Sequence, residues 1–232
     1  MASRSENRAF LVDRFLGRLV AERPASVLDV GCGSGDLLRR VAEQGIEVAG
    51  LDAPGPRIDG LAADGIVAIA GRAERLPFED DRFDWVTLRH VPHHLEDPAR
   101  AVAEAARVAR TGVLLAEPWY DRSIPSQEVG WQIDQWTRAD DRRRGRLHGV
   151  GFGPAELAGL VAEADPRASI ELETHLRPAL EELDALRASL DERLTDLAAE
   201  DPTRTALAGL WAAALEHGAG LGGSAFAIAR LG

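Results

Sequence analysis

The stretch VLDVGCGSG, residues 27–35, joins a run of apolar residues to glycines at alternate positions. The apolar run predicts a buried strand that leads into a helix. Gly31, Gly33 and Gly35 allow a tight turn and let a ligand approach the main chain without meeting a Cβ atom. We therefore expect a nucleotide-like ligand at this turn.

An aspartate just before the turn narrows the class of ligand. The dinucleotide fingerprint G-x-G-x-x-G would place its third glycine where this chain has Asp36. The carboxylate of Asp29 would repel a pyrophosphate and attract a ligand that carries ammonium and sulfonium groups. Asp52 ends the next predicted strand, near the interval of about 20 residues at which an acidic group meets ribose hydroxyls. The pattern favours a cationic nucleoside over a nicotinamide dinucleotide.

Outward from the turn, apolar periodicity predicts strands that alternate with helices. This alternation predicts an α/β fold with a doubly wound, mostly parallel, seven-stranded sheet covered on both faces. The predicted strands are 26–31, 46–52, 66–70, 83–88, 113–119, 168–174 and 224–230. The predicted helices are 6–22, 35–44, 56–63, 97–110 and 154–164, with two more within 178–217.

Two stretches depart from this alternation, and we interpret them as insertions. We expect an N-terminal helix within 1–24, followed by one domain over 25–232. A helical lid is inserted at about 120–152 and is expected to roof the substrate pocket, with an added surface helix as the alternative. A leucine-rich hairpin at about 178–217 is expected to cover the core, with a dimer face as the alternative.

The composition of the chain limits the kinds of partner that we expect the protein to bind. The net charge of -11 argues against a general affinity for nucleic acid, which requires clustered cations. The chain has neither the roughly 18 consecutive apolar residues of a membrane span nor the apolar centre of a secretory signal. Cys32 is the single cysteine, which excludes an internal disulfide and a cysteine metal cluster. We expect a cytoplasmic protein with a small-molecule substrate, and a homodimer stays open.

Four segments resemble, in order, the motifs of class I S-adenosylmethionine-dependent methyltransferases: VLDVGCGSGDLL, GLDAP, GRAERLPFEDDRFDWVTLRHVPHHLEDPARAVAEAARVAR and LLAEPW. They cover about residues 25–120 and are most similar to members that methylate small molecules such as quinone precursors and other specialised metabolites. The resemblance implies a Rossmann-like methyltransferase fold, with S-adenosyl-L-methionine as the donor and S-adenosyl-L-homocysteine as the product. Oxygen is the favoured acceptor atom, and nitrogen and carbon stay open. The alternative is a cofactor-binding scaffold of the same fold that transfers no methyl group.

The resemblance also assigns the cofactor contacts. It implies that the turn surrounds the methionine part of the cofactor, that Asp52 accepts from the ribose hydroxyls and that Ala53 lies beside the adenine. For Cys32, at the middle of the turn, a packing role is expected rather than a nucleophilic one. The full set is Asp29, Gly31, Cys32, Gly33, Gly35, Asp52, Ala53, Arg72, Ala73, Glu74, Arg89 and His94.

Arg72 departs from the family pattern. The usual D-A-E-x-L-P-F begins with an aspartate that accepts from the adenine amino group, whereas this chain has Arg72, Ala73 and Glu74 at those places. An arginine has no hydrogen-bond acceptor. Glu74 or a main-chain carbonyl substitutes, or the affinity for the cofactor is reduced, and Arg72 is also able to stack on the base.

The acceptor is expected beyond the carboxyl ends of the strands, where ligands bind in open parallel sheets. For His90 and His94 we expect structural support, with His90 facing the acceptor and His94 next to the methionine part as the functional alternatives. His148, which follows a basic run, is the candidate general base, with a structural role as the alternative. His90, His93 and His94 are close in sequence, but no cysteine cluster accompanies them. No metal site is predicted.

Overall fold

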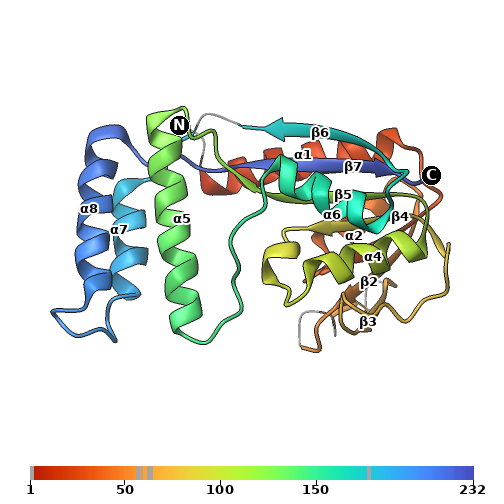
Figure 1. Ribbon diagram of the computed structural model, residues 1–232, viewed down its shortest axis with the longest axis horizontal. Coiled ribbons are helices and arrows are strands. Elements are labelled where there is room, and N and C mark those ends of the chain that lie inside the picture. Colours follow the sequence, from red (N-terminus) through yellow and green to blue (C-terminus); the bar gives the residue numbers. More distant parts are fainter. Residues whose placement is uncertain (1–2, 56–57, 59, 62–64, 177–178) are drawn as a thin grey trace. The chain divides into compact units, whose positions relative to one another are not determined.

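Seven strands form one sheet in the order β3-β2-β1-β4-β5-β7-β6 in the computed structural model, which describes residues 3–55, 58, 60–61, 65–176 and 179–232 (Figure 1). Parallel pairing joins β1 to β2 and β4, β2 to β3, and β4 to β5. The sheet is mostly parallel, which confirms the predicted fold class. The strands are β1 Ser26–Val30, β2 Glu47–Asp52, β3 Val67–Ala70, β4 Phe83–Arg89, β5 Ala109–Trp119, β6 Ser169–His175 and β7 Gly223–Arg230.

The described helices follow the predicted alternation. They are α1 Arg4–Ala21, α2 Asp36–Ala42, α4 Pro98–Val108, α5 Pro125–Arg143, α6 Pro154–Ala164, α7 Leu183–Glu192 and α8 Pro202–His217, with a short 3-10 helix η2 at Pro92–His94. In Figure 1, α4 and α6 lie on one face of the sheet and α1 on the other. The predicted helix at 56–63 lies largely outside the described residues.

Two predicted boundaries are wrong at one place, because the helix expected over 97–110 ends at Val108 and the strand expected over 113–119 begins at Ala109. Asp97 caps the start of this helix by accepting from the amide of Arg100 at 2.9 Å. Ala109 is already extended and pairs with Phe83 of β4, so the helix passes directly into β5. Pairing with a neighbouring strand decides this boundary, and helical periodicity does not reveal it.

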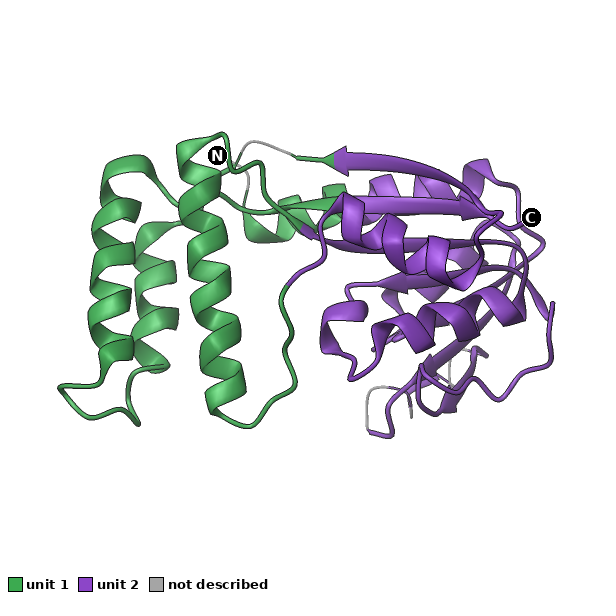
Figure 2. Cartoon of the chain, viewed as in Figure 1, with its two compact units in different colours: residues 1–11, 119–150, 175–224 green, residues 12–118, 151–174, 225–232 purple. Residues whose placement is uncertain are grey.

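The chain divides into two compact units (Figure 2). The sheet unit comprises residues 12–118, 151–174 and 225–232, and the helical unit comprises residues 1–11, 119–150 and 175–224. Both predicted insertions contribute to the helical unit, and no local pattern in either stretch predicts that they associate. Among the described residues, none of the helices has the length and apolar character needed to cross a membrane.

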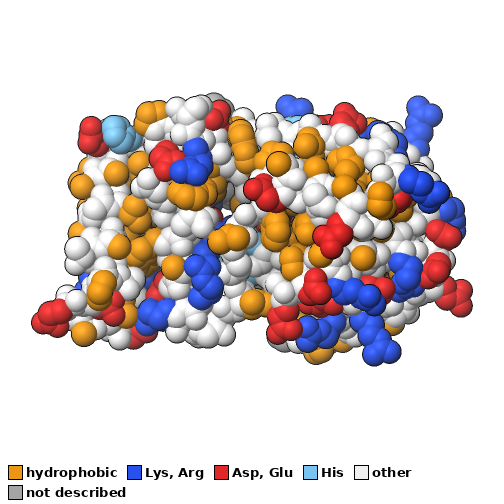
Figure 3. All heavy atoms as spheres, in the orientation of Figure 1, with side chains coloured by type: hydrophobic (Ala, Val, Ile, Leu, Met, Phe, Trp, Pro, Cys, Tyr) orange, Lys and Arg blue, Asp and Glu red, His pale blue; other side chains and the backbone are white. Residues whose placement is uncertain are grey.

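The core of the sheet unit lies between the sheet and its helices. Phe15 of α1 meets Phe226 of β7 edge to face, with ring centroids 5.4 Å apart. Buried side chains from both ends of this unit's sequence complete the cluster, namely Leu19, Val27, Leu37, Val41, Trp85, Leu114, Ala116 and Ile228. On the face shown in Figure 3, basic and acidic side chains of this unit lie next to one another. Among its ion pairs are Arg82–Glu47 at 2.9 Å and Arg110–Asp84 at 2.7 Å.

The helical unit has a core of its own, formed by α5, α7 and α8. Its buried apolar side chains are Val129, Ile133, Trp136, Leu186, Leu190, Leu194, Leu207, Ala214 and Ala219. The indole nitrogen of Trp136 donates to the carbonyl of Thr203 at 3.2 Å, which joins α5 to α8. The leucine spacing thus marks a core face within this unit.

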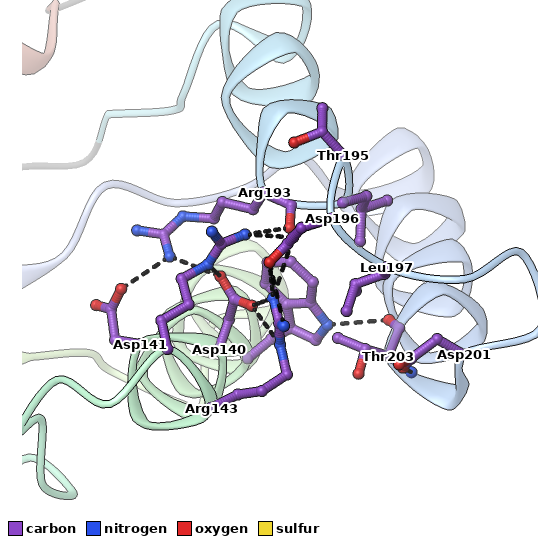
Figure 4. A network of polar contacts seen from close by, with 12 residues as sticks. Asp140, Asp141, Arg143, Arg193, Thr195, Asp196, Leu197, Asp201 and Thr203 are labelled. Atoms are coloured by element: carbon purple, nitrogen blue, oxygen red, sulfur yellow. Dashed lines mark hydrogen bonds and ion pairs between the residues drawn. The ribbon is translucent and has the colours of Figure 1, made fainter.

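An ionic network closes one end of the helical unit (Figure 4). The carboxylate of Asp140, on α5, is fully buried and accepts from Arg143, Arg144 and Arg193. The same carboxylate therefore joins the end of α5 to the segment that follows α7. Burial opposes ionisation of Asp140, but the three arginines outweigh it and hold the pKa of this carboxyl below its ordinary value.

We predict that Asp140→Asn lowers the free energy of unfolding by about 2 kcal/mol near neutral pH, because a buried carboxylate partner of three arginines is lost. A carboxyl whose pKa is lowered by folding stabilises the protein above its unfolded pKa, about 3.9, and this contribution is lost as the pH falls through the folded value. The difference between the two proteins, measured by urea unfolding, should therefore shrink below about pH 4.

Asp191→Asn is the matched control, because Asp191 forms an ion pair with Arg187 in which both side chains are 48% exposed. Its effect on the free energy of unfolding should stay within about 0.5 kcal/mol. Equal effects of the two substitutions would contradict the role assigned to Asp140.

Candidate functional site

The turn after β1 is held by the end of β2. The amides of Gly31 and Cys32 both donate to the carbonyl of Leu51, at 2.7 and 3.1 Å. The amide of Gly33 donates to the Oδ2 atom of Asp52 at 2.6 Å, and Asp52 Oδ1 accepts from the amide of Ala53 at 2.7 Å. A carboxylate has about four acceptor positions, so Asp52 keeps the capacity to accept from a diol.

The glycines of the turn have different surroundings. Gly31 has a φ of 75°, and a Cβ atom there would lie 2.2 Å from Val91 Cγ2, so packing requires glycine at this place. Gly33 has a φ of 55°, and a Cβ atom there would meet nothing within 4 Å. Gly35 is the residue before α2. The turn is therefore open at Gly33, where a ligand can reach the main chain.

Asp29, in β1, is a buried carboxyl with 4% of its surface exposed. Its Oδ1 atom accepts from the hydroxyl of Thr87, in the adjacent strand β4, at 2.7 Å. Burial raises its pKa to about 6, although the bond from Thr87 and the charge of Arg89 act in the opposite direction. A cation placed beside this carboxyl would favour its ionised form.

Cys32 is buried under the turn, in a cluster with Leu38 of α2 and Leu61. Burial raises the pKa of its thiol to about 12, and the neighbouring charges of Asp29 and Asp52 act in the same direction. A thiol in this state is a poor nucleophile near neutral pH. These surroundings support the packing role expected for it.

The loop that follows β3 is held from α4, which the sequence analysis missed. Glu104, buried on α4, accepts from the amide of Leu76 at 2.9 Å. Arg107, one turn later, donates to Glu104 at 2.8 Å and to the carbonyls of Leu76 and Phe78 at 3.1 and 2.8 Å. The acid and base three residues apart on one helix were the signal for this support. Ala73 is buried within the supported loop.

Arg72 projects into solvent, with 66% of its side chain exposed. Its guanidinium lies 3.1 Å from Glu96 and 3.5 Å from Glu74. The side chain of Glu74 is only 15% exposed. The side chain of Glu74 is therefore better protected from solvent than that of Arg72, the residue that differs from the family pattern.

The stretch after β4 contains three histidines, and their surroundings differ. Arg89 ends β4 opposite Ala116 of β5, and the amide of His90 donates to the carbonyl of Ala116 at 2.7 Å. His90 has a φ of 58°, which is uncommon for a residue other than glycine. His94 is exposed at the end of η2.

His93, which the local motifs do not single out as a site residue, forms a short, buried contact with the neighbouring strand β5. Its Nδ1 atom lies 2.6 Å from Glu117 Oε2, and both side chains are buried, at 5% and 0% exposed. Glu117 lies in β5, so the pair joins the segment after β4 to the neighbouring strand. The two partners are 24 positions apart in the sequence, so local motifs do not reveal this contact.

His148 belongs to the helical unit, where its Nδ1 atom lies 2.8 Å from Asp141 Oδ2. Burial opposes ionisation of Asp141, but hydrogen bonds from His148 and Arg193 hold the pKa of this carboxyl below its ordinary value. Arg142 donates to the main-chain carbonyl of His148 at 2.7 Å. The imidazole is thus oriented by a carboxylate, an arrangement that a general base requires.

Within the sheet unit, three of the predicted cofactor residues lie at the same end of the sheet, where the parallel strands have their carboxyl ends. Asp29, Asp52 and Arg89 lie at or near the carboxyl ends of the neighbouring strands β1, β2 and β4. A buried carboxyl, an opening at Gly33 and a carboxylate with spare acceptor positions suit an ammonium, a backbone contact and a ribose diol. These residues fit a cationic nucleoside.

We predict that Thr87→Val raises the pKa of Asp29 above its value of about 6, because the buried carboxylate loses its hydrogen-bond donor. Thr87→Ser keeps the donor and should leave the pKa close to the value in the unaltered protein. Carbon NMR titration of the Asp29 carboxyl measures both. An unchanged pKa in Thr87→Val would show that this hydroxyl does not stabilise the charged form.

Comparison with known proteins gives a consistent result. Residues 28–116 match a family described as a methyltransferase domain. An uncharacterized methyltransferase of Mycobacterium tuberculosis is 38% identical over 107 residues, which are 45% of this chain and 42% of that protein. A ubiquinone biosynthesis O-methyltransferase of Alkalilimnicola ehrlichii is 29% identical over 176 residues, which are 62% of this chain and 69% of that protein.

A solved structure extends the likeness in fold beyond the matched segment. The YcgJ protein of Bacillus subtilis superposes with a TM-score of 0.63 over 94% of this chain and 97% of that chain, at 20% identity. This likeness concerns the fold alone. The chain spans about half the length of the first curated relatives that it matches.

Proposed function

We propose, from the premise that residues 28–116 form a class I S-adenosylmethionine-dependent methyltransferase domain, that this chain methylates a small organic acceptor. S-adenosyl-L-methionine is the donor and S-adenosyl-L-homocysteine the product. The observation that carries the proposal is the edge formed by Asp29, the turn open at Gly33, and Asp52. It offers two carboxyl groups and little that would hold a pyrophosphate.

Each part of the donor has residues suited to it. Asp29 would hold the ammonium, Gly33 would approach the methionine part, and Asp52 would accept from the ribose hydroxyls. When bound, the donor supplies a methyl group already activated by its sulfonium. The residues of this chain then have to align donor and acceptor and exclude water.

At the adenine end, we infer that Glu74 replaces the aspartate that Arg72 displaces. Glu74 is the more protected of the two side chains and can accept from an amino group, whereas Arg72 is held in solvent beside Glu96. The buried Ala73 would offer its amide to an adenine nitrogen, in a loop fixed by Glu104.

Oxygen is the proposed acceptor atom. Support comes from the relative named as a ubiquinone biosynthesis O-methyltransferase and from a second, 32% identical over 123 residues, named as a malonyl-[acyl-carrier protein] O-methyltransferase. An acceptor from specialised metabolism, a cytoplasmic location and a homodimer stay predictions.

We predict that Asp52→Ala weakens the binding of S-adenosyl-L-homocysteine by roughly ten- to a hundredfold, because charge-assisted hydrogen bonds to the ribose are lost. Calorimetry measures the affinity, and Glu43→Ala, at an exposed residue just after α2, is the control. Binding of NADH in place of S-adenosyl-L-homocysteine would contradict the assignment of the ligand.

We predict that His148→Ala lowers the rate of methyl transfer by about 10²–10⁴-fold near neutral pH and leaves the affinity for the donor unchanged. The bond to Asp141 makes Nε2 of His148 the nitrogen that would take the proton from an acceptor hydroxyl. The loss should shrink at high pH, where the acceptor ionises unaided. Single-turnover rates across pH measure this, and His217→Ala, at an exposed histidine, is the control.

The alternative function is a cofactor-binding scaffold without methyl transfer, and it is tested with the unaltered protein. Radiolabelled donor is incubated with metabolite extracts, and the organic products are counted. Tight binding of S-adenosyl-L-homocysteine together with no transfer above a protein-free control would favour the scaffold over the enzyme.

A further inference from the structure

The helical unit contains a cavity of about 210 Å³ whose lining includes none of the residues proposed to hold the methyl donor. Residues from all three of its sequence segments line this cavity, among them Arg4, Tyr120, Asp134, Thr137, Ser189 and Arg193. Every lining residue belongs to the helical unit. The cavity is therefore a property of this unit by itself.

Tyr120 is seated in a slot made by glycines. A Cβ atom at Gly222 would lie 2.8 Å from Tyr120 Cζ, and one at Gly130 would lie 3.2 Å from Tyr120 Cε1. Any larger residue at either place would displace the ring. Burial raises the pKa of Tyr120 above its ordinary value, so the phenol keeps its proton and can donate.

The segment that carries the slot is fixed by hydrogen bonds within the unit. The amide of Gly220 donates to the carbonyl of Ser126 at 2.7 Å, and that of Leu221 to Ala179 at 2.9 Å. The side chain of Gln127, 2% exposed, donates to the carbonyl of Leu221 at 3.0 Å. The wall of the cavity beside Tyr120 is thus preorganised.

The charged groups around the cavity already have partners of opposite sign. Arg4 pairs with Glu181 at 2.7 Å, and Asp134 pairs with Arg138 at 2.6 Å. Arg193 lies 3.0 and 2.9 Å from the carboxylates of Asp140 and Asp141. These charges are therefore compensated within the protein, so a charged ligand would gain less from them than from groups without a partner of opposite sign.

Three hydroxyl groups and an apolar wall remain for a ligand. In the described part of the chain, the hydroxyls of Tyr120, Thr137 and Ser189 make no hydrogen bond to protein. Apolar side chains complete the lining, namely Ile133, Leu186 and Leu190. Hydroxyls on several sides and an apolar wall are complementary to a flat ring that carries polar substituents.

We propose that this cavity binds an uncharged, single-ring aromatic molecule that bears two or more hydroxyl groups. The size agrees with this class, because a cavity of about 150 Å³ holds benzene and hydroxyl substituents need additional space. The ring packs against the apolar wall, and its hydroxyls exchange hydrogen bonds with Tyr120, Thr137 and Ser189. Such a molecule disturbs none of the ion pairs.

Phloroglucinol is the probe for this proposal, and its binding to the full chain is measured by calorimetry without any methyl donor. Three further probes test the features of the ligand one at a time. Benzene lacks the hydroxyl groups, myo-inositol lacks the aromatic ring, and benzoate carries a negative charge. Each should bind more weakly than phloroglucinol. Equal or tighter binding of myo-inositol or benzoate would overturn the proposed class, and no binding of phloroglucinol would overturn the site.

Two variants localise the binding. Tyr120→Phe keeps the ring in its slot and should weaken phloroglucinol binding roughly two- to tenfold, as expected for one hydrogen bond. Ser189→Trp fills the cavity and should abolish binding, whereas Ala188→Trp, at the exposed neighbouring residue that does not line the cavity, should leave it unchanged. Binding that survives in Ser189→Trp would contradict the location.

The ligand has two possible sources, an acceptor of the methyl group or a separate effector. Mass spectrometry of phloroglucinol incubated with the chain and S-adenosyl-L-methionine distinguishes them, because only an acceptor gains a methyl group. The binding measurement needs neither donor nor turnover. Failure of the proposed methyl transfer would therefore leave the proposal for the cavity intact.

Discussion

The hydrogen bonds between the turn after β1 and the end of β2 are the constraint on which the site depends. Two amides of the turn are used by the carbonyl of Leu51 and a third by the carboxylate of Asp52. In a dinucleotide fold, amides of such a turn are directed at a pyrophosphate. Here they are directed at the protein, so the turn presents carboxylate oxygens and an opening at Gly33. This arrangement makes an anion unfavourable beside the carboxylates and suits a cationic nucleoside.

The same arrangement explains why a buried carboxyl is tolerated in the centre of the sheet. Burying a charge is costly unless a partner compensates it, and Asp29 has the Thr87 hydroxyl as its close donor and the charge of Arg89 nearby. The raised pKa is the expression of that incomplete compensation. A ligand ammonium would complete it, so part of the binding energy arises from a group that the fold leaves under-satisfied. Perturbed pKa values of this kind are typical of functional sites.

Much of the sheet unit could be predicted from the sequence, because strand and helix periodicities are local and the glycine turn has few conformations. Contacts between segments that are distant in the sequence could not be predicted in this way. Glu104 and Arg107 support a loop about 30 residues away, and His93, in η2, meets Glu117 of β5, although each residue is ordinary in its own segment. The end of α4 was misplaced for the same reason, since pairing with β4 sets the start of β5. Topology, not local pattern, brings these groups together.

The division between the units also separates the part of the chain that matches a known family from parts that lie outside this match. The match to the methyltransferase domain, residues 28–116, falls wholly within the sheet unit, where the groups suited to the donor lie. The helical unit lies outside that match, and it holds the oriented His148, the ionic network around Asp140 and the cavity beside Tyr120. Function on a shared fold is set by the sites added to it. Under the proposed function, we therefore expect the specificity for the acceptor to depend on side chains of the helical unit, because the groups suited to the donor lie in the sheet unit.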